Sequence, residues 1–355
     1  MAYNIITLPV TIFFIACGCG QLFYAIILQK KFSKEHNFHN SVFAFFLWIT
    51  AGLLFPFYYS TDNANIRWFQ AVSTFFICVF TPLMLFLILF YQYKKVKKNP
   101  EIRERRNIKV FLKEYDERHK GLERSISTDL HRKLLHLFPA TLIIVLWVFS
   151  VYVWAGMWNA DKVWGISGED YGIFLILTAG FGGILVFAAL DFVRLSYIFE
   201  DRNIHHLLPD NVTDLLGNAM KRREIFEFTK PALLVLAMAP VFFFPFGVFA
   251  AAALIATIGD GAASIIGMKY GKHHFPKNSS KTLEGYISGF LASFGIAVLC
   301  LWIFEPQLVL IKIAVIAIAG ATIFLITDLL SLEVDDNMIN PIFCGIVMTF
   351  LYFLL

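Results

Sequence analysis

The sequence predicts an all-α, polytopic integral membrane protein with about ten transmembrane helices. Hydrophobic residues make up 58% of the 355 residues and charged residues only 16%, a composition that excludes an ordinary soluble domain. Apolar stretches close to the ~20 residues that cross a bilayer recur along the whole chain. Because lipid offers no hydrogen-bond partner to a free peptide group, these stretches must be helical.

The charges between the apolar stretches predict the orientation of the bundle. Basic residues follow the first stretch, at Lys30 and Lys31, and the third, at 94–98, whereas the turn at 60–63 is nearly uncharged. The positive-inside rule then places the N-terminus outside and both basic loops in the cytoplasm. The same bias explains the net charge of +4, so no nucleic-acid partner is expected. The sequence leaves the oligomeric state open.

Ten spans follow from this pattern. The first five cover 6–28, 41–59, 71–93, 134–155 and 171–190. A short sixth, broken by Pro240 and Pro245, lies within 226–244, and a seventh begins near 246. The last three are 286–304, 308–330 and the C-terminal stretch. The chain thus divides into a three-span region at 1–93, a basic cytoplasmic linker at 94–133 and a seven-span domain at 134–355.

The linker carries apolar residues at helical spacing: Ile108, Leu112, Tyr115, Leu122, Ile126 and Leu130. This spacing predicts an amphipathic helix on the cytoplasmic membrane surface. The alternative is a solvated linker helix without lipid contact.

Counting crossings places every prominent ionisable cluster on the cytoplasmic face. The clusters are His131 to Lys133, Asp191 with Arg194, Arg222 to Glu227, residues 260–285, and Asp335 to Asn337. The simplest interpretation of Asp191 and Arg194, three residues apart, is a local ion pair.

Residues 259–285 carry the most informative pattern. Asp260 is followed by four lysines and two histidines, and no acidic residue occurs again before Glu284. On a helix Asp260, Ser264, Gly267 and Gly271 share one narrow face. Small-residue packing between membrane helices explains the glycines. It leaves Asp260, which has no obvious local cation, as a candidate ligand of a divalent metal ion.

The loop at 269–281 offers lysines to phosphate oxygens, with Lys272, Lys277 and Lys281 as candidates. It is not a Walker A loop, because His273 follows Lys272 where that motif has Ser or Thr. Ser280, Lys281 and Thr282 stand directly before an apolar helix, whose free N-terminal amides favour an anion. The alternative is an ordinary positive-inside loop with polar histidines.

A second acidic site lies near the C-terminus. Asp335, Asp336 and Asn337 form an acidic loop on a face otherwise rich in lysine and arginine. Asp336 suits a second magnesium carboxylate or a base for a substrate hydroxyl, and the alternative is helix capping. Lys133 and His136, before the fourth span, either face the same site or anchor the helix at the interface.

These motifs together resemble one enzyme family. The run from Gly259-Asp260 through Gly267 to Gly271-Lys272, followed by Lys281-Thr282-x-Glu284-Gly285, resembles the CTP-binding signature of CTP-dependent lipid kinases and phosphatidate cytidylyltransferases. With Arg132-Lys133-x-x-His136 and Asp336-Asn337, the chain over 134–355 is similar to the dolichol kinase, phytol kinase and CTP-dependent diacylglycerol kinase family.

The resemblance implies a cytoplasm-facing kinase that uses CTP and Mg²⁺ to phosphorylate a membrane lipid alcohol, most simply dolichol or another polyprenol. It implies a metal site at Asp260 and Asp336, with Asn337, Lys133 and His136 completing the catalytic set. The CTP-binding residues it implies are Gly267, Gly271, Lys272, Lys277, Ser280, Lys281, Thr282 and Glu284.

Two alternatives stay open. A lipid cytidylyltransferase would release pyrophosphate rather than CDP, but the C-terminal motif of the common cytidylyltransferases is absent. A non-catalytic scaffold or transporter is the other alternative, although a transporter favours charges at the bilayer midplane. The chain departs from the kinase pattern at 328–333, where Asp328-Leu-Leu-Ser331 stands in place of a Glu and a Ser-Pro-Gly stretch.

Overall fold

The computed structural model describes residues 3–59, 64–118, 126–277, 279, 281–330 and 332–355, and shows the side chains of all but seven of them. The described chain is all-helical apart from loops and one isolated bridge between His274 and Thr282. Nine helical segments within these residues are long and apolar enough to span a membrane. The predicted polytopic helix bundle is thereby confirmed, while the sidedness of the N-terminus stays a prediction.

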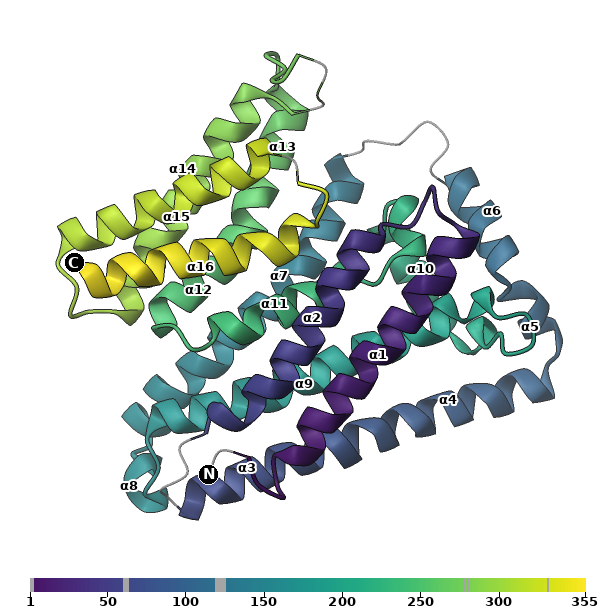
Figure 1. Ribbon diagram of the computed structural model, residues 1–355, viewed down its shortest axis with the longest axis horizontal. Coiled ribbons are helices and arrows are strands. Elements are labelled where there is room, and N and C mark those ends of the chain that lie inside the picture. The colour runs from purple at the N-terminus through teal and green to yellow at the C-terminus, as the bar shows by residue number, and fades with distance from the viewer. Residues whose placement is uncertain (1–2, 60–63, 119–125, 278, 280, 331) are drawn as a thin grey trace. The chain divides into compact units, whose positions relative to one another are not determined.

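The chain folds into two compact units (Figure 1). Unit 1 comprises residues 1–123 and 145–232, and unit 2 comprises 124–144 and 233–355. Unit 1 holds α1 (Leu8–Lys31), α2 (Phe38–Leu54), α3 (Ala64–Phe75), α4 (Thr81–Lys98), α5 (Glu101–Arg105), α6 (Ile108–Arg118), α8 (Ala160–Trp164), α9 (Gly168–Leu195) and α10 (Asp210–Ala219). Unit 2 holds α12 (Phe246–Leu254), α13 (Asp260–Tyr270), α14 (Leu283–Phe304), α15 (Leu310–Leu330) and α16 (Asp336–Leu354). Two helices, α7 (Ile126–Val148) and α11 (Lys230–Val241), begin in one unit and end in the other.

The predicted sixth span is short, lies within 226–244 and is broken by Pro240 and Pro245. The structure has α11 there, with 12 residues. At 1.5 Å per residue it reaches about 18 Å, short of the ~30 Å hydrocarbon core, so it does not cross a bilayer alone. In the segment before it, the backbone N–H of Thr229 donates to Asp191 Oδ2 at 2.7 Å.

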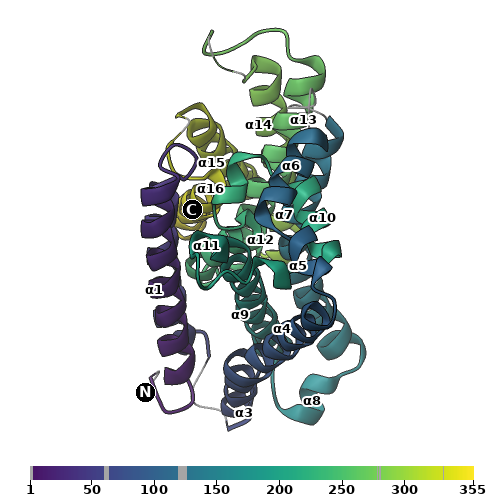
Figure 2. The same cartoon turned by 90° about the vertical axis from the view of Figure 1, so that its right-hand side faces the viewer.

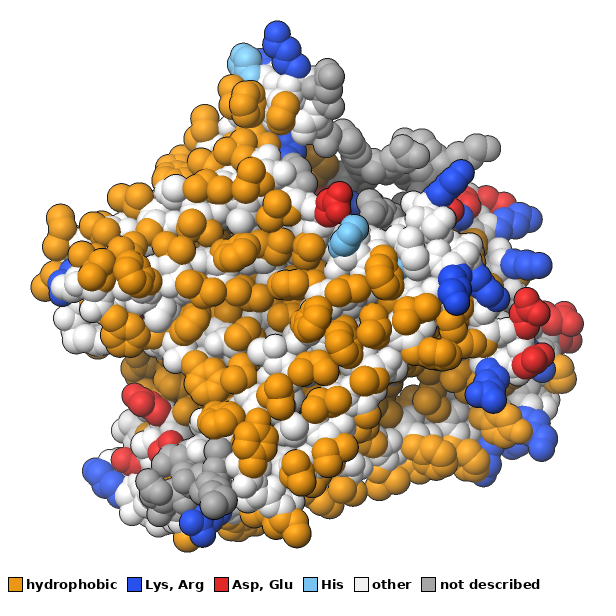
Figure 3. All heavy atoms as spheres, in the orientation of Figure 1, with side chains coloured by type: hydrophobic (Ala, Val, Ile, Leu, Met, Phe, Trp, Pro, Cys, Tyr) orange, Lys and Arg blue, Asp and Glu red, His pale blue; other side chains and the backbone are white. Residues whose placement is uncertain are grey.

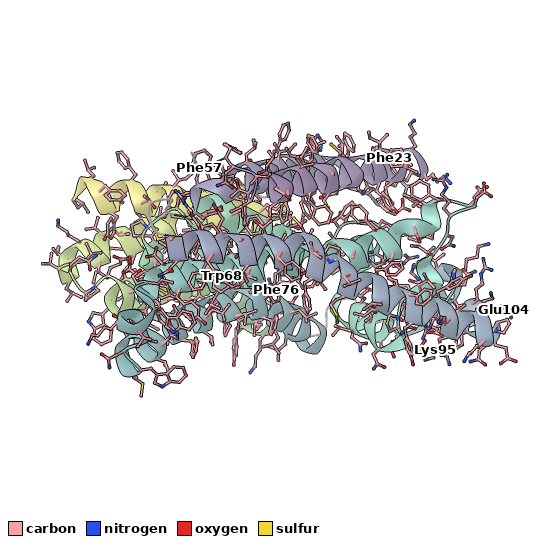
Figure 4. The ribbon with its side chains drawn as sticks, turned by 90° about the horizontal axis from the view of Figure 1, so that it is seen from below. Phe23, Phe57, Trp68, Phe76, Lys95 and Glu104 are labelled. Carbon is pink, nitrogen blue, oxygen red and sulfur yellow. The ribbon has the colours of Figure 1, made fainter. Side chains whose placement is uncertain are left out.

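Unit 1 is built around α9, which packs against α1, α3 and α4. Phe181 on α9 lies 4.6 Å from the Phe14 ring and 5.1 Å from the Phe55 ring, measured between centroids. Outward-facing aromatic side chains cover the same helices, as Figure 4 shows for Phe57, Trp68 and Phe76. This arrangement, with apolar groups both inside and outside, is that of a membrane-embedded bundle.

The lysines that end α1 and α4 mark one end of unit 1. Lys30 and Lys31 end α1, and Lys95, Lys97 and Lys98 lie in the last turn of α4. Figure 3 shows basic side chains at this end, around α5 and α6. Figure 4 shows Lys95 and Glu104 at the same end. Arg106 closes the end by donating to Asp210 Oδ1 at 2.9 Å and to Gln92 Oε1 at 3.0 Å.

The apolar face of α6, in the predicted linker, packs against other parts of unit 1. The sequence had predicted either a membrane-surface helix or a solvated helix. Phe111 and Tyr115 on α6 form a core with Ile225 and Phe226, and the Tyr115 hydroxyl donates to the Met220 carbonyl at 2.9 Å. The face therefore packs against protein instead of lying on lipid or in water. Leu122 falls outside the described residues.

Unit 2 is centred on α14, which contacts α12, α13 and α15, while α15 packs on α16. Glu305, just beyond α14, marks one end of the unit and accepts from the Gly247 N–H at 2.8 Å and from the Tyr352 hydroxyl at 2.9 Å. At the opposite end the loop 271–282 projects past the ends of α13 and α14 (Figure 2). The predicted site residues gather toward this second end.

Candidate functional site

Two polar contacts join α7 to α13 in unit 2. Lys133 Nζ forms an ion pair with Asp260 Oδ2, and Ser264 Oγ donates to Asp129 Oδ2 at 2.6 Å. The pairs 129–264 and 133–260 define an antiparallel register, and the same register sets His136 opposite Thr257. Both of these residues are buried. Lys133 and Asp260 were both predicted as site residues from the sequence, and the structure brings them into contact.

Asp260 has no cation near it in the sequence, but it has one in the fold. Lys133 is its cation, from 127 residues away in the chain. The pair is largely shielded, with side-chain exposures of 8% for Lys133 and 19% for Asp260. Asp260 lies ten residues before Tyr270, where α13 ends. At 1.5 Å per residue, this places Asp260 about 15 Å along the helix from that end. An ion pair at such a depth is costly to bury, which makes it a candidate for function.

A second lysine–carboxylate pair lies at the same end. Lys281 Nζ donates to Asp328 Oδ1 at 2.8 Å and also to the Asp328 backbone carbonyl. Asp328 was noted in the sequence only as a departure from the kinase pattern. One signal marked it: a carboxylate in the last turn of α15 faces the negative end of the helix dipole, so it needs a compensating cation.

The loop 271–282 is held by contacts from its own residues and from the start of α14. Glu284 Oε1 lies 2.7 Å from His273 Nδ1, and Glu284 Oε2 accepts from the His273 N–H at 3.3 Å. Thr282 caps α14 by accepting from the Gly285 N–H at 3.2 Å. Glu284 thus positions the loop, and its role in binding CTP stays a prediction.

The loop lysines Lys272 and Lys277 are solvent-exposed. Such side chains are free to turn toward a polyphosphate, but the contacts of the loop do not fix them on one. Ser280, also predicted to bind CTP, lies outside the described residues.

Helix packing explains the two predicted CTP-binding glycines. A Cβ on Gly267 would lie 3.1 Å from Thr282 Oγ1, and one on Gly271 would lie 2.2 Å from the Gly267 carbonyl oxygen. Their small size lets α13 approach α14 and the loop closely. The packing alternative weighed for the sequence accounts for both positions, so neither glycine adds evidence for a ligand.

The acidic loop before α16 combines capping with an unsatisfied group. Asp335 is the N-cap of α16, and its Oδ1 accepts from the Asn337 N–H at 2.9 Å and from Asn337 Nδ2 at 2.6 Å. Asn337 Nδ2 also lies 3.2 Å from Asp336 Oδ1. Asn337 is only 2% exposed, and its Oδ1 is buried with no hydrogen-bond partner among the described residues. A buried acceptor in this condition indicates a missing donor or cation.

The described residues contain no group of three or more His, Cys, Asp or Glu side chains arranged around one point. The predicted pairing of Asp260 with Asp336 on one ion is therefore not a preformed carboxylate cage. Mg²⁺ does not require one, because it is usually held by one or two carboxylates together with substrate phosphates. Asp260, Asp336 and the amide oxygen of Asn337 are oxygen donors of the type that this ion takes.

Unit 1 contains a contrasting polar cluster, which confirms the predicted Asp191–Arg194 ion pair. Arg194 Nη2 lies 2.8 Å from Asp191 Oδ1, and the side chains are 3% and 1% exposed. The guanidinium also donates to the Ile225 and Glu227 carbonyls. Asp191 Oδ2 accepts from both the N–H and the hydroxyl of Thr229. This cluster is closed by protein groups.

Comparison with known proteins adds no further identification: no protein-family model matches the chain, and neither a curated protein nor a solved structure is significantly similar to it.

Proposed function

We propose that this multi-pass membrane protein is a CTP-dependent kinase that transfers the γ-phosphoryl group to a membrane lipid alcohol, dolichol or another polyprenol being the simplest acceptor. The reacting groups would lie at the polar end of unit 2, on the cytoplasmic face. One observation carries the proposal: the run that resembles the CTP-binding signature supplies one member to each of two lysine–carboxylate pairs, Asp260 to the pair with Lys133 and Lys281 to the pair with Asp328.

Phosphoryl transfer requires mainly positioning and stabilisation of charge. Lys133 and Lys281 each hold an ammonium group against a carboxylate, and phosphate oxygens of a nucleotide can replace that carboxylate as the partner. The same exchange would release Asp260 for a cation. When bound with the nucleotide, Mg²⁺ would supply charge neutralisation at the phosphates. Asp260, Asp336 and Asn337 would hold it.

The acceptor hydroxyl also needs a group that takes its proton. Asp336, at the first turn of α16, and His136, buried on α7, are the two candidates in the predicted site. A neutral imidazole nitrogen can accept a proton, and a carboxylate accepts a hydroxyl proton in other kinases. Both residues belong to unit 2.

The test is a product assay with purified protein, Mg²⁺ and CTP labelled at the γ-phosphate. Dolichol, phytol and diacylglycerol are supplied in separate reactions. We expect a labelled lipid phosphate and CDP. Label in pyrophosphate would instead indicate cytidylyl transfer, and no product with any acceptor would contradict both reactions.

The site assignment is tested in the same assay by a matched lysine pair. Lys281→Met removes a proposed phosphate ligand and should lower turnover by about 10²-fold, the typical effect of one electrostatic group. Lys269→Met removes an exposed lysine of α13 that lies over the Tyr270 ring at 5.0 Å. It should leave turnover within about twofold.

A further inference from the structure

Unit 1 contains a hollow of about 660 Å³ at the C-terminal end of α1, within the size range of ligand sites. One wall is apolar. The Phe23 and Phe199 rings stack with centroids 5.9 Å apart, Tyr24 meets Phe199 at 5.0 Å, and Ile27 lies one turn further along α1. Charged residues complete the lining.

The apolar wall is continuous with the lipid-facing surface of α1. This helix is one of the candidate membrane spans, and Phe23 and Ile26 on its outer side are 56% and 41% exposed. Figure 4 shows Phe23 near the end of unit 1 that carries Lys95 and Glu104. The hollow therefore lies where an apolar helix surface meets the charged end, which in a bilayer is the level of the lipid headgroups.

The polar rim contains two cations and two carboxylates: Lys31, Arg202, Glu200 and Asp201. Lys31 Nζ donates to the Ile198 carbonyl at 2.8 Å and lies 3.9 Å from Glu200 Oε1. The side chains of Lys31 and Glu200 are 44% and 92% exposed, so both charges are open to a ligand. The rim as a whole is neutral.

We propose that this hollow binds the headgroup of a zwitterionic phospholipid with a primary amine, of the phosphatidylethanolamine type. Lys31 and Arg202 would contact the phosphate. Glu200 and Asp201 would accept hydrogen bonds from the ammonium group, and the acyl chains would follow Phe23 and Ile27 into the bilayer. A purely anionic headgroup would face two carboxylates, and a quaternary amine has no N–H to donate. The proposal is independent of the kinase reaction.

Native mass spectrometry of delipidated full-length protein tests the headgroup. The protein is mixed with equal amounts of dioleoyl phosphatidylethanolamine, phosphatidylcholine, phosphatidylglycerol and phosphatidic acid. We expect phosphatidylethanolamine to be retained preferentially. Equal retention of all four lipids, or preference for any of the other three, would overturn the assignment.

Matched variants test the location. Lys31→Ala and Arg202→Ala should each lower retention of phosphatidylethanolamine about fivefold, the effect of losing one partly exposed charged contact. Lys30→Ala, which removes the neighbouring lysine outside the hollow, should not. Phe23→Ala should lower retention, whereas Ile26→Ala, an equally lipid-facing truncation, should leave it unchanged. An equally large loss of phosphatidylethanolamine retention in Lys30→Ala and Ile26→Ala would show that the lipid binds elsewhere. Thermal unfolding of each variant establishes that it is folded.

Discussion

Two buried ion pairs, one in each unit, have different surroundings. Asp191 and Arg194 in unit 1 are enclosed by Thr229 and by the Ile225 and Glu227 carbonyls, so protein groups satisfy both charges. Asp260 in unit 2 meets Lys133, and its side chain keeps 19% exposure. The closed pair holds the 225–229 segment in place. The more open pair keeps a carboxylate and an ammonium group available for exchange, as a site for a metal–polyphosphate requires.

The largest expected effect is on the closed pair. Asp191→Ala leaves the Arg194 guanidinium buried without its carboxylate, which typically costs about 3–5 kcal/mol of folding free energy. Thermal unfolding in detergent should show a strongly lowered Tm. Asp161→Ala at the other end of unit 1 is the control. A Tm within 2 °C of wild type in Asp191→Ala would show that the cluster does not hold this unit together.

Asp260→Asn should affect activity more than stability. The amide keeps the shape of the side chain but loses the charge, so CTP-dependent phosphorylation should fall by about 10²–10³-fold, the cost of a key electrostatic group. The Tm should change less than in Asp191→Ala, since Asp260 is less enclosed. Unchanged phosphorylation by the folded variant would remove Asp260 from the site.

Acid should weaken unit 1 through His205, which lies against the Arg194 backbone. Burial lowers the pKa of His205 from 6.5 to about 4. The unfolded chain therefore takes up a proton before the folded chain does, and stability falls as the pH drops from 6.5 to 4. At 1.36 kcal/mol per pKa unit the loss is at most about 3 kcal/mol. His205→Phe should reduce the slope of Tm against pH in this range, and an unchanged slope would contradict the assignment.

The smallest effect concerns the glycines of the α13–α14 contact. A Cβ on Gly285 would lie 2.8 Å from the Ala263 carbonyl oxygen, whereas one on Gly261 would meet nothing within 4 Å. Gly285→Ala should therefore cost about 1–3 kcal/mol of stability, and Gly261→Ala should cost almost none. Because packing explains Gly285 and a Cβ on Gly261 has no neighbour, the KM for CTP should stay unchanged in both variants. A raised KM with normal stability would assign Gly285 to the nucleotide instead.

The sequence predicted the elements of unit 2 closely, because each is a long apolar run with a clear break. The stretches 286–304 and 308–330 correspond to α14 and α15 within three residues at each end. It failed where long-range contacts decide the structure. It does not show that Asp191 binds the Thr229 backbone before α11 begins. For the apolar face of the linker helix it left a lipid surface and water as alternatives, whereas Phe226 covers that face of α6.

The site was predicted as a set of residues, without its pairings. Charge pattern and motif resemblance named Lys133, Asp260 and Lys281, but hydrophobic periodicity carries no information on which helix faces which. The Lys133–Asp260 pair spans 127 positions and the Lys281–Asp328 pair spans 47. Asp328 was missed as a site residue for this reason. The unsatisfied Asn337 Oδ1 is likewise visible only once its surroundings are known.

The most direct test of the account is protection by the nucleotide. A ligand that binds the folded state alone stabilises it by about 2.7 kcal/mol at 100 times its Kd. Mg²⁺–CTP should therefore raise the Tm of the wild-type protein and of Lys269→Met, and should leave the Tm of Asp260→Asn unchanged. If Mg²⁺–CTP left the wild-type Tm unchanged, or raised that of Asp260→Asn equally, the polar end of unit 2 would not be a CTP site.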